Sequence, residues 1–485
     1  MKNPLILEIN TWVWLSELTI KYDQAVTLVN VPALEWDEIA QQGFDYLWLM
    51  GVWKRSPAGL EIALQHPDII HACQMALPGF TPMDMVGSAY CIQDYTIDQM
   101  LGGQEGILKA RTELKARGMG LILDFVPNHV APDHPWTREH PDYFIQGMEN
   151  DLLQTPDDFI PINGRVIARA RDPFFPPWPD VVQLNAFSGE LRKASVKTLL
   201  AIASLCDGVR CDMAMLMTNR IFEQTWGNKA GPKPTSEFWM EIIPEVKKMF
   251  PAFLFIAEVY WEMEWELQQQ GFDFCYDKRL YDRLLHDTAE SIRLHALAGL
   301  DYQEKLMRFI ENHDELRISS QLEVPRHSAA AVIFATLPGA RMFHHGQQEG
   351  YQTRIPVFLA KPVPEIRNHD LQEFYRNLLH LISQTLFHKG EWALCAVNGW
   401  PGNDTVRNLL AWSWSLPDRR ALVVINYSGM QAQGLVSWPW ADDPGKEVIL
   451  SDELHDTTYL RSNKELTDFG LYVDLNAWNY HFFIF

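Results

Sequence analysis

The sequence has few cysteines, no long apolar segment and too few basic residues to balance its acids. Six cysteines occur among 485 residues, without a closely spaced pair, so a disulfide framework is not expected. No apolar run approaches the ~20 residues that a membrane-spanning helix needs. The formal net charge of −21 argues against the basic face that nucleic acids and anionic membrane surfaces require. We therefore expect no nucleic-acid or membrane partner, and a neutral substrate in preference to a polyanion.

The start of the sequence also shows no apolar segment of the kind that a signal peptide carries. Residues 1–4 (MKNP) lead directly into a segment with the pattern of a strand, and no cleavage site of small residues is visible. Together with the sparse cysteines, this predicts a cytoplasmic protein. The sequence leaves the oligomeric state open.

Aromatic residues, in contrast, are abundant. They make up 12% of the chain, and 18 residues are tryptophan. A flat aromatic ring suits the apolar C–H face of a sugar ring, so the excess favours a carbohydrate substrate. A good share of these rings is also expected in the core, because large aromatic side chains are highly buried on average.

Short apolar segments alternate with helical segments over most of the chain, and a helix is expected at residues 189–205, for example. Apolar segments of this length are typical of strands that are buried on both faces of a parallel sheet. The alternation predicts an α/β protein whose core is a (β/α)8 TIM barrel. The expected strands cover residues 5–10, 46–50, 121–129, 208–212, 253–258, 272–277, 308–314 and 340–343.

The pattern also divides the chain. Residues 1–130 and 180–390 are expected to form the barrel. Residues 131–179, rich in proline, aspartate and aromatic residues, are interpreted as an insertion subdomain after the third strand. Residues 391–485 contain only short strands between turns, which predicts a C-terminal β-sandwich domain. A second long stretch, residues 54–97, contains four of the chain's prolines and is expected to be irregular.

Three of the expected strands end in an acid: Asp212, Glu258 and Asp314. Because strand ends converge at one face of a barrel, these carboxylates are expected to share a cleft and to shift one another's pKa values apart. Such a set suits acid–base chemistry at a glycosidic bond. Two alternatives stay open at this point, a metal site and acids that cap the helices after each strand.

The motifs around these acids resemble those of the α-amylase family of glycoside hydrolases, glycoside hydrolase family 13. Four motifs carry the resemblance, in the family's order and on the expected strands, and nearly the whole chain fits the family's organisation. They are residues 124–129 (DFVPNH), 208–212 (GVRCD), 257–259 (AEV) and 312–314 (NHD).

The resemblance implies a role for each residue of the motifs. Asp212 would be the nucleophile, Glu258 the general acid and base, and Asp314 a ligand of the sugar hydroxyls. Arg210 would keep Asp212 ionised, as a nearby cation does. The other residues that the resemblance assigns to substrate binding are Tyr90, Asp94, His129 and His313.

The sequence departs from the family at two places. Met215 and Leu216 stand where typical α-amylases have Lys-His, which removes the usual contacts on the acceptor side. Gln183 stands where the family usually has a calcium-binding Asp, while Asn128 is kept. Because an amide is a weaker ligand for a hard cation than a carboxylate, we expect no cofactor and no tight structural calcium.

We therefore predict a retaining enzyme that acts on α-glucosidic bonds of maltooligosaccharides, α-glucans or a disaccharide. Transfer to a sugar acceptor or phosphorolysis by the same fold is one alternative. A catalytically silent glucan-binding or scaffolding protein is another, because fold does not imply function. Both long segments, 54–97 and 131–179, are expected to wall off a pocket, which favours short substrates or chain ends over internal attack.

Overall fold

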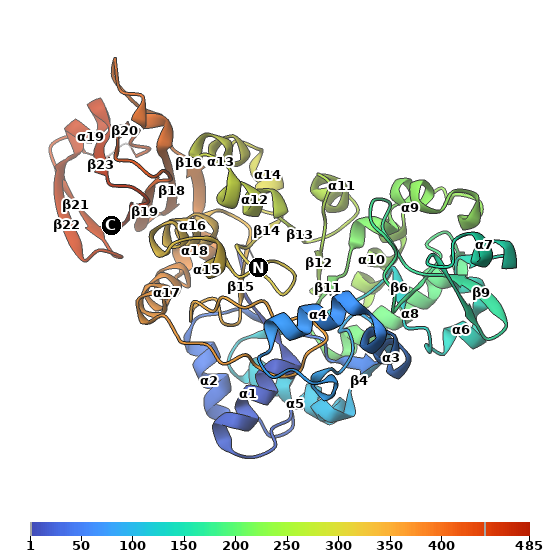
Figure 1. Cartoon of the computed structure of the whole chain (residues 1–485). Helices are drawn as coiled ribbons and strands as arrows, with labels where there is room; N and C mark the ends of the chain where they lie inside the picture. Colours follow the sequence, from blue (N-terminus) through green and yellow to red (C-terminus); the bar gives the residue numbers. More distant parts are fainter. Residues whose placement is uncertain (1, 441–442) are drawn as a thin grey trace.

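The computed structural model describes residues 2–440 and 443–485, and its centre is a closed barrel of eight parallel strands (Figure 1). The barrel confirms the predicted fold class. In their order around the barrel, the strands are β1 (Leu5–Asn10), β15 (Ala340–His344), β14 (Leu306–Arg308), β13 (Phe274–Tyr276), β12 (Leu254–Ala257), β11 (Gly208–Cys211), β5 (Gly120–Phe125) and β2 (Tyr46–Met50).

The barrel strands are apolar because helices cover the outside of the barrel and side chains from its strands fill the inside. Leu47, Leu121 and Val209 are fully buried. Several of the surrounding helices are buried along one side only. In α8 (Gly189–Leu205), which coincides with the predicted helix, the buried side recurs about once per turn, and the Ser188 side chain accepts a hydrogen bond from the Leu191 N–H to cap the first turn.

Outside the two long segments after β2 and β5, helices follow the barrel strands in the expected alternation. They are α1 (Thr11–Tyr22), α2 (Ala33–Gln41), α5 (Gly103–Ala116), α8, α9 (Asn219–Trp226), α10 (Phe238–Met249), α11 (Glu264–Gln269), α12 (Lys278–His286), α13 (Ala289–Ala296), α14 (Leu300–Gln303), α15 (Ile318–Gln321), α16 (Val324–Thr336), α17 (His369–Ile382) and α18 (Thr385–Lys389). No helix among the described residues is long and apolar enough to span a membrane.

The seventh barrel strand is shorter than predicted. The expected strand covered residues 308–314, but β14 ends at Arg308 and residues 309–314 run on beyond it. The Asn312 side chain accepts hydrogen bonds from the N–H groups of Asp314 and Glu315, both at 2.9 Å. This turn, which asparagine forms readily, lifts the His-Asp pair above the strand end.

The prolines of the segment after β2 predicted an irregular stretch, but the segment is partly helical. It forms the helices α3 (Pro57–Gln65) and α4 (Pro67–Ala76) and the hairpin of β3 (Trp53–Arg55) and β4 (Ile92–Ile97). Pro57 and Pro67 each occupy the first turn of a helix. Proline is favoured there because that position has no partner for an N–H group. The prediction was wrong because these prolines begin helices and do not interrupt them.

The segment after β5 carries a small sheet of its own. Its strands are β7 (Gln146–Gly147), β9 (Arg165–Ala168) and β8 (Phe159–Ile162), with the helices α6 (Trp136–Glu139) and α7 (Glu149–Gln154) beside them. The segment is tied back to the barrel by the pairing of β6 (His129–Val130) with β10 (Val182–Gln183).

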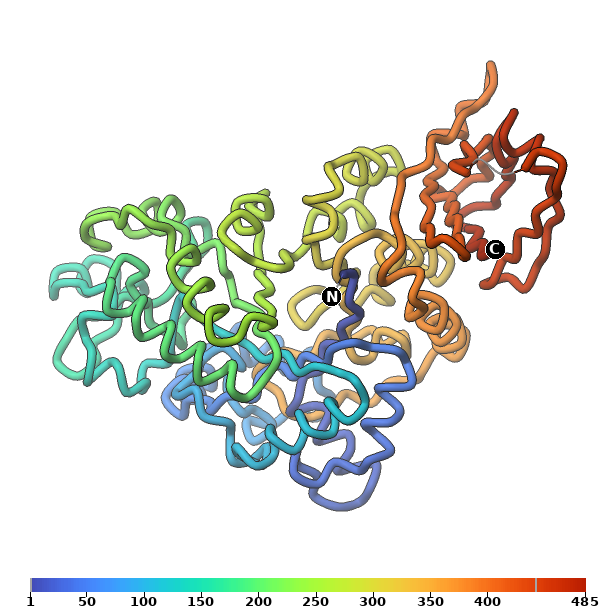
Figure 2. The backbone as a smooth tube through the Cα atoms, turned by 180° about the vertical axis from the view of Figure 1, so that it is seen from behind, coloured from blue at the N-terminus to red at the C-terminus, as the bar shows by residue number. Residues whose placement is uncertain are grey.

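The C-terminal part is all-β apart from the helix α19 (Asn463–Phe469), and it lies at the end of the molecule opposite to β7–β9 (Figures 1 and 2). A six-stranded sheet faces a three-stranded one. The larger consists of β16 (Glu391–Leu394), β18 (Leu409–Leu416), β19 (Arg419–Asn426), β24 (Tyr480–Ile484), β21 (Glu447–Asp452) and β22 (Thr457–Ser462), and the smaller of β17 (Val397–Asn398), β20 (Ala432–Val436) and β23 (Leu471–Leu475).

Alternation along β18 joins this part to the barrel. Leu409 and Ala411 belong to the core between the two sheets, while Trp412 and Trp414 belong to the barrel core. The indole N–H groups of Trp412 and Trp414 donate to the side chain and the carbonyl of Thr336 in α16, at 3.0 and 2.8 Å. The C-terminal part is therefore fixed to the outside of the barrel, away from the strand ends that carry the acids.

Candidate active site

A fully buried arginine, Arg210, organises the C-terminal end of the barrel. One nitrogen of the Arg210 guanidinium, Nη1, lies 2.7 Å from Asp212 Oδ1, and the other, Nη2, lies 2.7 Å from Glu258 Oε2. Asp124 Oδ1 lies 3.7 Å from Nη1. The predicted nucleophile and the predicted acid thus share a single cation, and a third carboxylate lies beside them.

The strand register brings these groups together. Arg210 of β11 lies beside Asp124 of β5 in the parallel pairing. The ladder continues one residue past the strands, because the N–H groups of Asp212 and Glu258 donate to carbonyls of the neighbouring strands at 2.9 and 3.0 Å. Each acid is therefore the first residue after its strand, at the face where barrel enzymes carry their active sites.

The backbone next to Asp212 is held in an uncommon conformation. Met213 has a φ of 42°, in the left-handed region that side chains other than glycine seldom adopt. In this conformation its N–H donates to Glu258 Oε2 at 2.6 Å. The Tyr260 hydroxyl donates to the other oxygen, Oε1, at 2.9 Å. Strained residues of this kind cluster at functional sites, and here the strain helps to orient the Glu258 carboxyl group.

The two acids differ in what surrounds them. Burial raises the pKa of Glu258 to about 7, against the opposing effect of Arg210. Burial also raises the pKa of Asp212, while Arg210, which donates a hydrogen bond to it, opposes that rise. Near neutral pH this arrangement lets Glu258 exchange a proton, while the hydrogen bond from Arg210 favours the ionised form of Asp212. Carboxyl pairs with separated roles of this kind are the pattern of acid–base sites.

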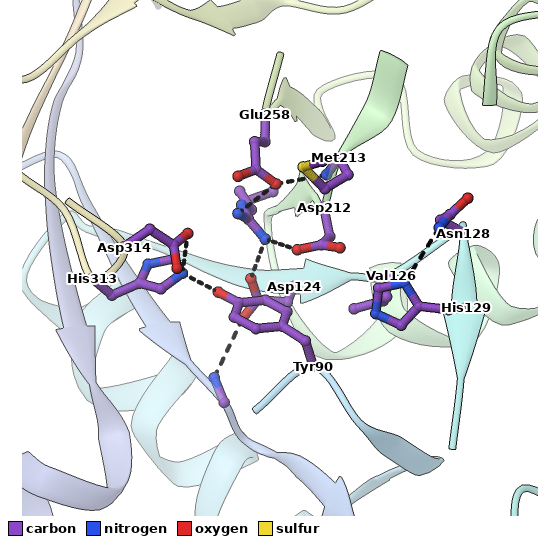
Figure 3. Close-up of polar contacts among 12 residues, drawn as sticks. Tyr90, Asp124, Val126, Asn128, His129, Asp212, Met213, Glu258, His313 and Asp314 are labelled. Atoms are coloured by element: carbon purple, nitrogen blue, oxygen red, sulfur yellow. Dashed lines mark hydrogen bonds and ion pairs between the residues drawn. The ribbon is translucent and has the colours of Figure 1, made fainter. Parts of the chain in front are cut away.

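A second cluster faces the first from the loop after β14. His313 Nε2 lies 3.0 Å from Asp314 Oδ2 and 2.7 Å from the Tyr90 hydroxyl (Figure 3). Burial disfavours a charge on His313, but Asp314 and Glu8 outweigh it and raise the His313 pKa well above its usual value. Asp314 is partly open, with 46% of its side chain exposed. Burial raises its pKa and His313 lowers it, with a net value of about 2.

These groups open onto a cavity of about 530 Å³. The long segments after β2 and β5 both contribute to its wall, as predicted. Its aromatic lining comes from Tyr90, Phe175, Trp178, Tyr260 and Phe358, and its acidic lining from Asp172, Asp180, Asp212, Glu258 and Asp314. The cavity therefore combines ring faces with carboxylates.

The comparisons with known proteins agree with this geometry. The family model for the α-amylase catalytic domain matches residues 37–175. This match, the curated relatives and the solved structures all point to the α-amylase family, glycoside hydrolase family 13. It is 22% identical over 292 residues to alpha-amylase 3 of Dictyoglomus thermophilum, covering 55% of this chain and 54% of that protein. It is 26% identical over 249 residues to alpha-amylase MalA of Haloarcula japonica, covering 49% of this chain and 33% of that protein.

Solved structures from the family show the same fold over the whole length. A maltogenic alpha-amylase, AmyB of Thermotoga neapolitana, superposes with a TM-score of 0.70 at 20% identity and covers 100% of this chain and 99% of its own. An alpha-amylase of Lactobacillus plantarum gives 0.69 at 19% identity, with the same shares of the two chains covered. In sequence, in contrast, the chain spans about half or less of the curated amylases that it matches.

Two further residues of the predicted site differ in their placement. His129 lines the cavity with its ring 5.3 Å from that of Trp178, and burial lowers its pKa to about 3, so it faces a substrate as a neutral ring. Asp94 lies on β4 opposite Lys54 and is not among the described residues that line the cavity. The structure thus brings His129 to the site, whereas it places Asp94 on the hairpin beside it.

The two departures from the family have clear structural settings. Met215 and Leu216 lie in the short 3-10 helix η4 (Ala214–Met217) and are buried, so they present no polar group to a substrate. Where the family has its calcium ligand, the Gln183 amide donates to the side-chain and main-chain oxygens of Asn128 at 2.8 and 3.0 Å. An N–H donor thus occupies the place from which a carboxylate would bind a cation. Among the described residues, no cluster of three or more His, Cys, Asp or Glu side chains could hold a metal ion.

Several residues of the site were not predicted from the sequence. Tyr260, Trp178, Asp172 and Asp180 come from loops, where no periodic pattern marks the residues that turn inward. Glu8 carried a signal that could have been used, since it is the one charged residue in the apolar strand β1. A buried charge needs a partner, and that partner lies in the site.

Proposed function

We propose that the chain is a retaining enzyme that cleaves or transfers unphosphorylated α-glucosyl groups. The observation that carries this proposal is the sharing of Arg210 by Asp212 and Glu258. Two carboxyl groups bound to one guanidinium lie close together. This favours the separation of about 5–5.5 Å found in retaining glycosidases over the wider spacing of inverting ones.

The reaction would take place in two displacements. In the first, an Asp212 oxygen forms a bond to the anomeric carbon while the bond from that carbon to the leaving oxygen breaks, and Glu258 gives its proton to that oxygen. In the second, Glu258 takes a proton from water or from a sugar hydroxyl, whose oxygen displaces Asp212 from the anomeric carbon. Two inversions leave the original configuration. Asp314, Tyr90, His129 and His313 would hold the sugar.

The charge of the cavity supports a neutral substrate. Five carboxyl groups line it, while neither lysine nor arginine is among the described residues of its wall. An anionic phosphate group would meet these carboxylates without a cation to pair with. Two other relatives are a trehalose-6-phosphate hydrolase and a maltosyltransferase that uses maltose 1-phosphate, matched over 16% and 33% of this chain. We propose that this chain differs from both in rejecting phosphorylated sugars.

The shape of the cavity supports action on short sugars or on chain ends. Walls from the segments after β2 and β5, together with Val357 and Phe358 after β15, surround the acids. Loops that enclose a barrel site limit how much of a polymer can lie across it. The burial of Met215 and Leu216 leaves the acceptor side without the polar pair of typical α-amylases. We also propose a cytoplasmic location, which the six free and buried cysteines support.

A substrate panel tests the proposal. The protein is incubated with maltose, trehalose, sucrose, maltooligosaccharides, soluble starch and maltose 1-phosphate, each with and without inorganic phosphate, and all products are separated by chromatography. We expect small sugars to appear early from neutral substrates, independently of phosphate, and no turnover by the Asp212→Asn variant. Rapid shortening of starch without small sugars would contradict the proposed exo action. Activity that requires phosphate would contradict the rejection of phosphorylated sugars. Tight glucan binding without turnover would indicate a binding protein.

A further inference from the structure

Glu8 is a fully buried carboxylate in the middle of the first barrel strand. Its exposed fraction is 0%, and the strand around it is apolar. An unpaired charge in such a place would cost several kcal/mol, so a carboxylate here requires a reason. Its Oε1 atom makes a short contact with His313 Nδ1, across 305 positions of sequence. The contact joins the first strand to the loop that carries Asp314.

His313 extends this contact to the cavity. Its Nδ1 atom faces Glu8, and its Nε2 atom faces Asp314 Oδ2 at 3.0 Å and the Tyr90 hydroxyl at 2.7 Å. The His313 ring lies against Tyr90 with centroids 5.4 Å apart and a 24° angle between planes. An imidazolium donates from both nitrogens. A protonated His313 between two carboxylates therefore uses both of its N–H groups.

The charges around Glu8 and His313 favour an ionised Glu8 and a His313 ring that is protonated at both nitrogens. Burial raises the pKa of Glu8, but the contact with His313 outweighs burial and lowers that pKa overall. Burial lowers the pKa of His344 well below its usual value, so it adds little positive charge. Charged or titratable groups face Glu8 or His313 from five further elements. They are Asp124 in β5, Asp212 directly after β11, Tyr276 in β13, Tyr90 before β4 and Asp314 after β14.

We propose that Glu8 is a positioning residue that keeps His313 protonated at both nitrogens, so that the Nε2–H group fixes Asp314 and Tyr90 at the cavity. Glu8 touches no substrate in this account and acts through His313. The inference deepens the proposed function, on which its catalytic consequence rests. The ionic contact itself stands on the geometry of Glu8, His313 and Asp314.

Glu8→Gln is the direct test, because glutamine keeps the shape of glutamate and removes its charge. Without that charge His313 loses its proton at a lower pH, and above that pH the imidazolium that fixes Asp314 and Tyr90 is lost. We expect kcat/KM to fall about 10- to 100-fold, as when a carboxylate that orients a metal-bound histidine is removed. We also expect the alkaline limb of the pH profile to move to lower pH while the acid limb stays in place, which a purely structural loss would not produce.

Two further variants separate positioning from stability. Asp452→Asn removes another buried carboxylate that contacts a histidine, His481 Nδ1 at 2.7 Å, in β21 of the C-terminal part. It serves as the matched control and is expected to lower the melting temperature without changing the pH profile. In a His313→Asn background, Glu8→Gln should cause no further loss of kcat/KM, because its effect passes through His313. Losses that multiply in the double variant would overturn the proposal.

A measurement without substrate separates this inference from the proposed function. Nitrogen-15 NMR of histidine-labelled wild-type protein reports the protonation of both His313 nitrogens, with His313→Asn providing the assignment. We expect a doubly protonated ring well above the ordinary histidine pKa of about 6.5, and a lower pKa in Glu8→Gln. A wild-type His313 that titrates at its ordinary value would overturn the proposal, even if the enzyme is active. A doubly protonated ring in a protein without turnover would uphold the contact and reject the proposed function.

Discussion

Two fully buried arginines of the barrel, Arg210 on β11 and Arg308 on β14, are built into clusters with opposite electrostatic balance. Arg308 contacts one acid, Asp277, and the same acid lies 2.9 Å from His295 Nε2. Burial raises the pKa of Asp277, but His295 and Arg308 lower it far more, so its net pKa lies well below the usual value.

At Arg210 the numbers are reversed, because one guanidinium lies beside three carboxyl groups. Burial raises the pKa of Asp124 to about 6 and that of Glu258 to about 7, even with Arg210 beside them. The Arg210 cluster also reaches the cavity, through Asp212 and Glu258. The two clusters therefore differ in their surplus of carboxylates and in their access to the cavity, and these two features set the proposed catalytic cluster apart from the cluster of Arg308.

The largest predicted effect is on activity at the Arg210 cluster. Asp212→Asn removes the nucleophile, and we expect kcat/KM to fall by about 10⁴-fold, as for other residues that make the covalent bond. The melting temperature should not fall, because Arg210 keeps Glu258 and Asp124 as partners. Steady-state kinetics and thermal unfolding check both parts. Turnover close to that of the wild type would remove Asp212 from the mechanism.

The reverse outcome is predicted at the Arg308 cluster. Asp277→Asn leaves the buried guanidinium of Arg308 without a carboxylate, which should lower the free energy of unfolding by about 3–5 kcal/mol. Activity at a permissive temperature should be kept. Denaturant unfolding provides the measurement, with Asp212→Asn as the matched acid-to-amide control. If both variants had the same stability, the distinction between the clusters would be lost.

The pH dependence of activity also distinguishes the Arg210 cluster from the Arg308 cluster. Glu258 must carry a proton to protonate the leaving oxygen, and its pKa is raised to about 7. Activity on a maltooligosaccharide should therefore fall as the pH rises through about 7. With α-glucosyl fluoride, whose leaving group needs no proton, this fall should disappear from the first step. Asp277, with its lowered pKa, should not titrate in this range. An alkaline limb of equal size for both substrates would contradict the role of Glu258.

The smallest predicted effect concerns calcium. Because the Gln183 amide donates to Asn128 where the family has a carboxylate ligand, EDTA should leave the melting temperature and activity unchanged. A matched series with added calcium provides the control. A marked drop with EDTA that calcium restores would show that other groups bind the ion.

The sequence predicted the barrel and its acids because both depend on local patterns. Each of Asp212 and Glu258 directly follows an apolar strand, and parallel strands bring their ends to one face. The helices α3 and α4 were missed because Pro57 and Pro67 read as breaks although they begin helices. The contact of Glu8 with His313 could not be predicted, since no local pattern relates residues 305 positions apart.

The residues that line the cavity could also be predicted only in part from the sequence. Trp178 lies in a proline-rich segment whose composition predicted a wall, and Asp180 follows that segment directly. Which of their side chains turn inward depends on the packing of loops. Asp94 was assigned to substrate binding by the resemblance to the family, yet it lies on β4 outside the cavity lining. Its part in substrate binding stays a prediction.

The most direct test of the proposed two-step mechanism, with Asp212 as the nucleophile, is to trap the glycosyl-enzyme intermediate. The Glu258→Gln variant is mixed with α-glucosyl fluoride, quenched with acid, digested and analysed by mass spectrometry. The fluoride leaves without a proton donor, whereas the second step lacks its base, so the intermediate should accumulate. We expect a glucosyl group on the peptide that contains Asp212. An unlabelled Asp212, with wild-type enzyme releasing β-glucose from the start of the reaction, would contradict it.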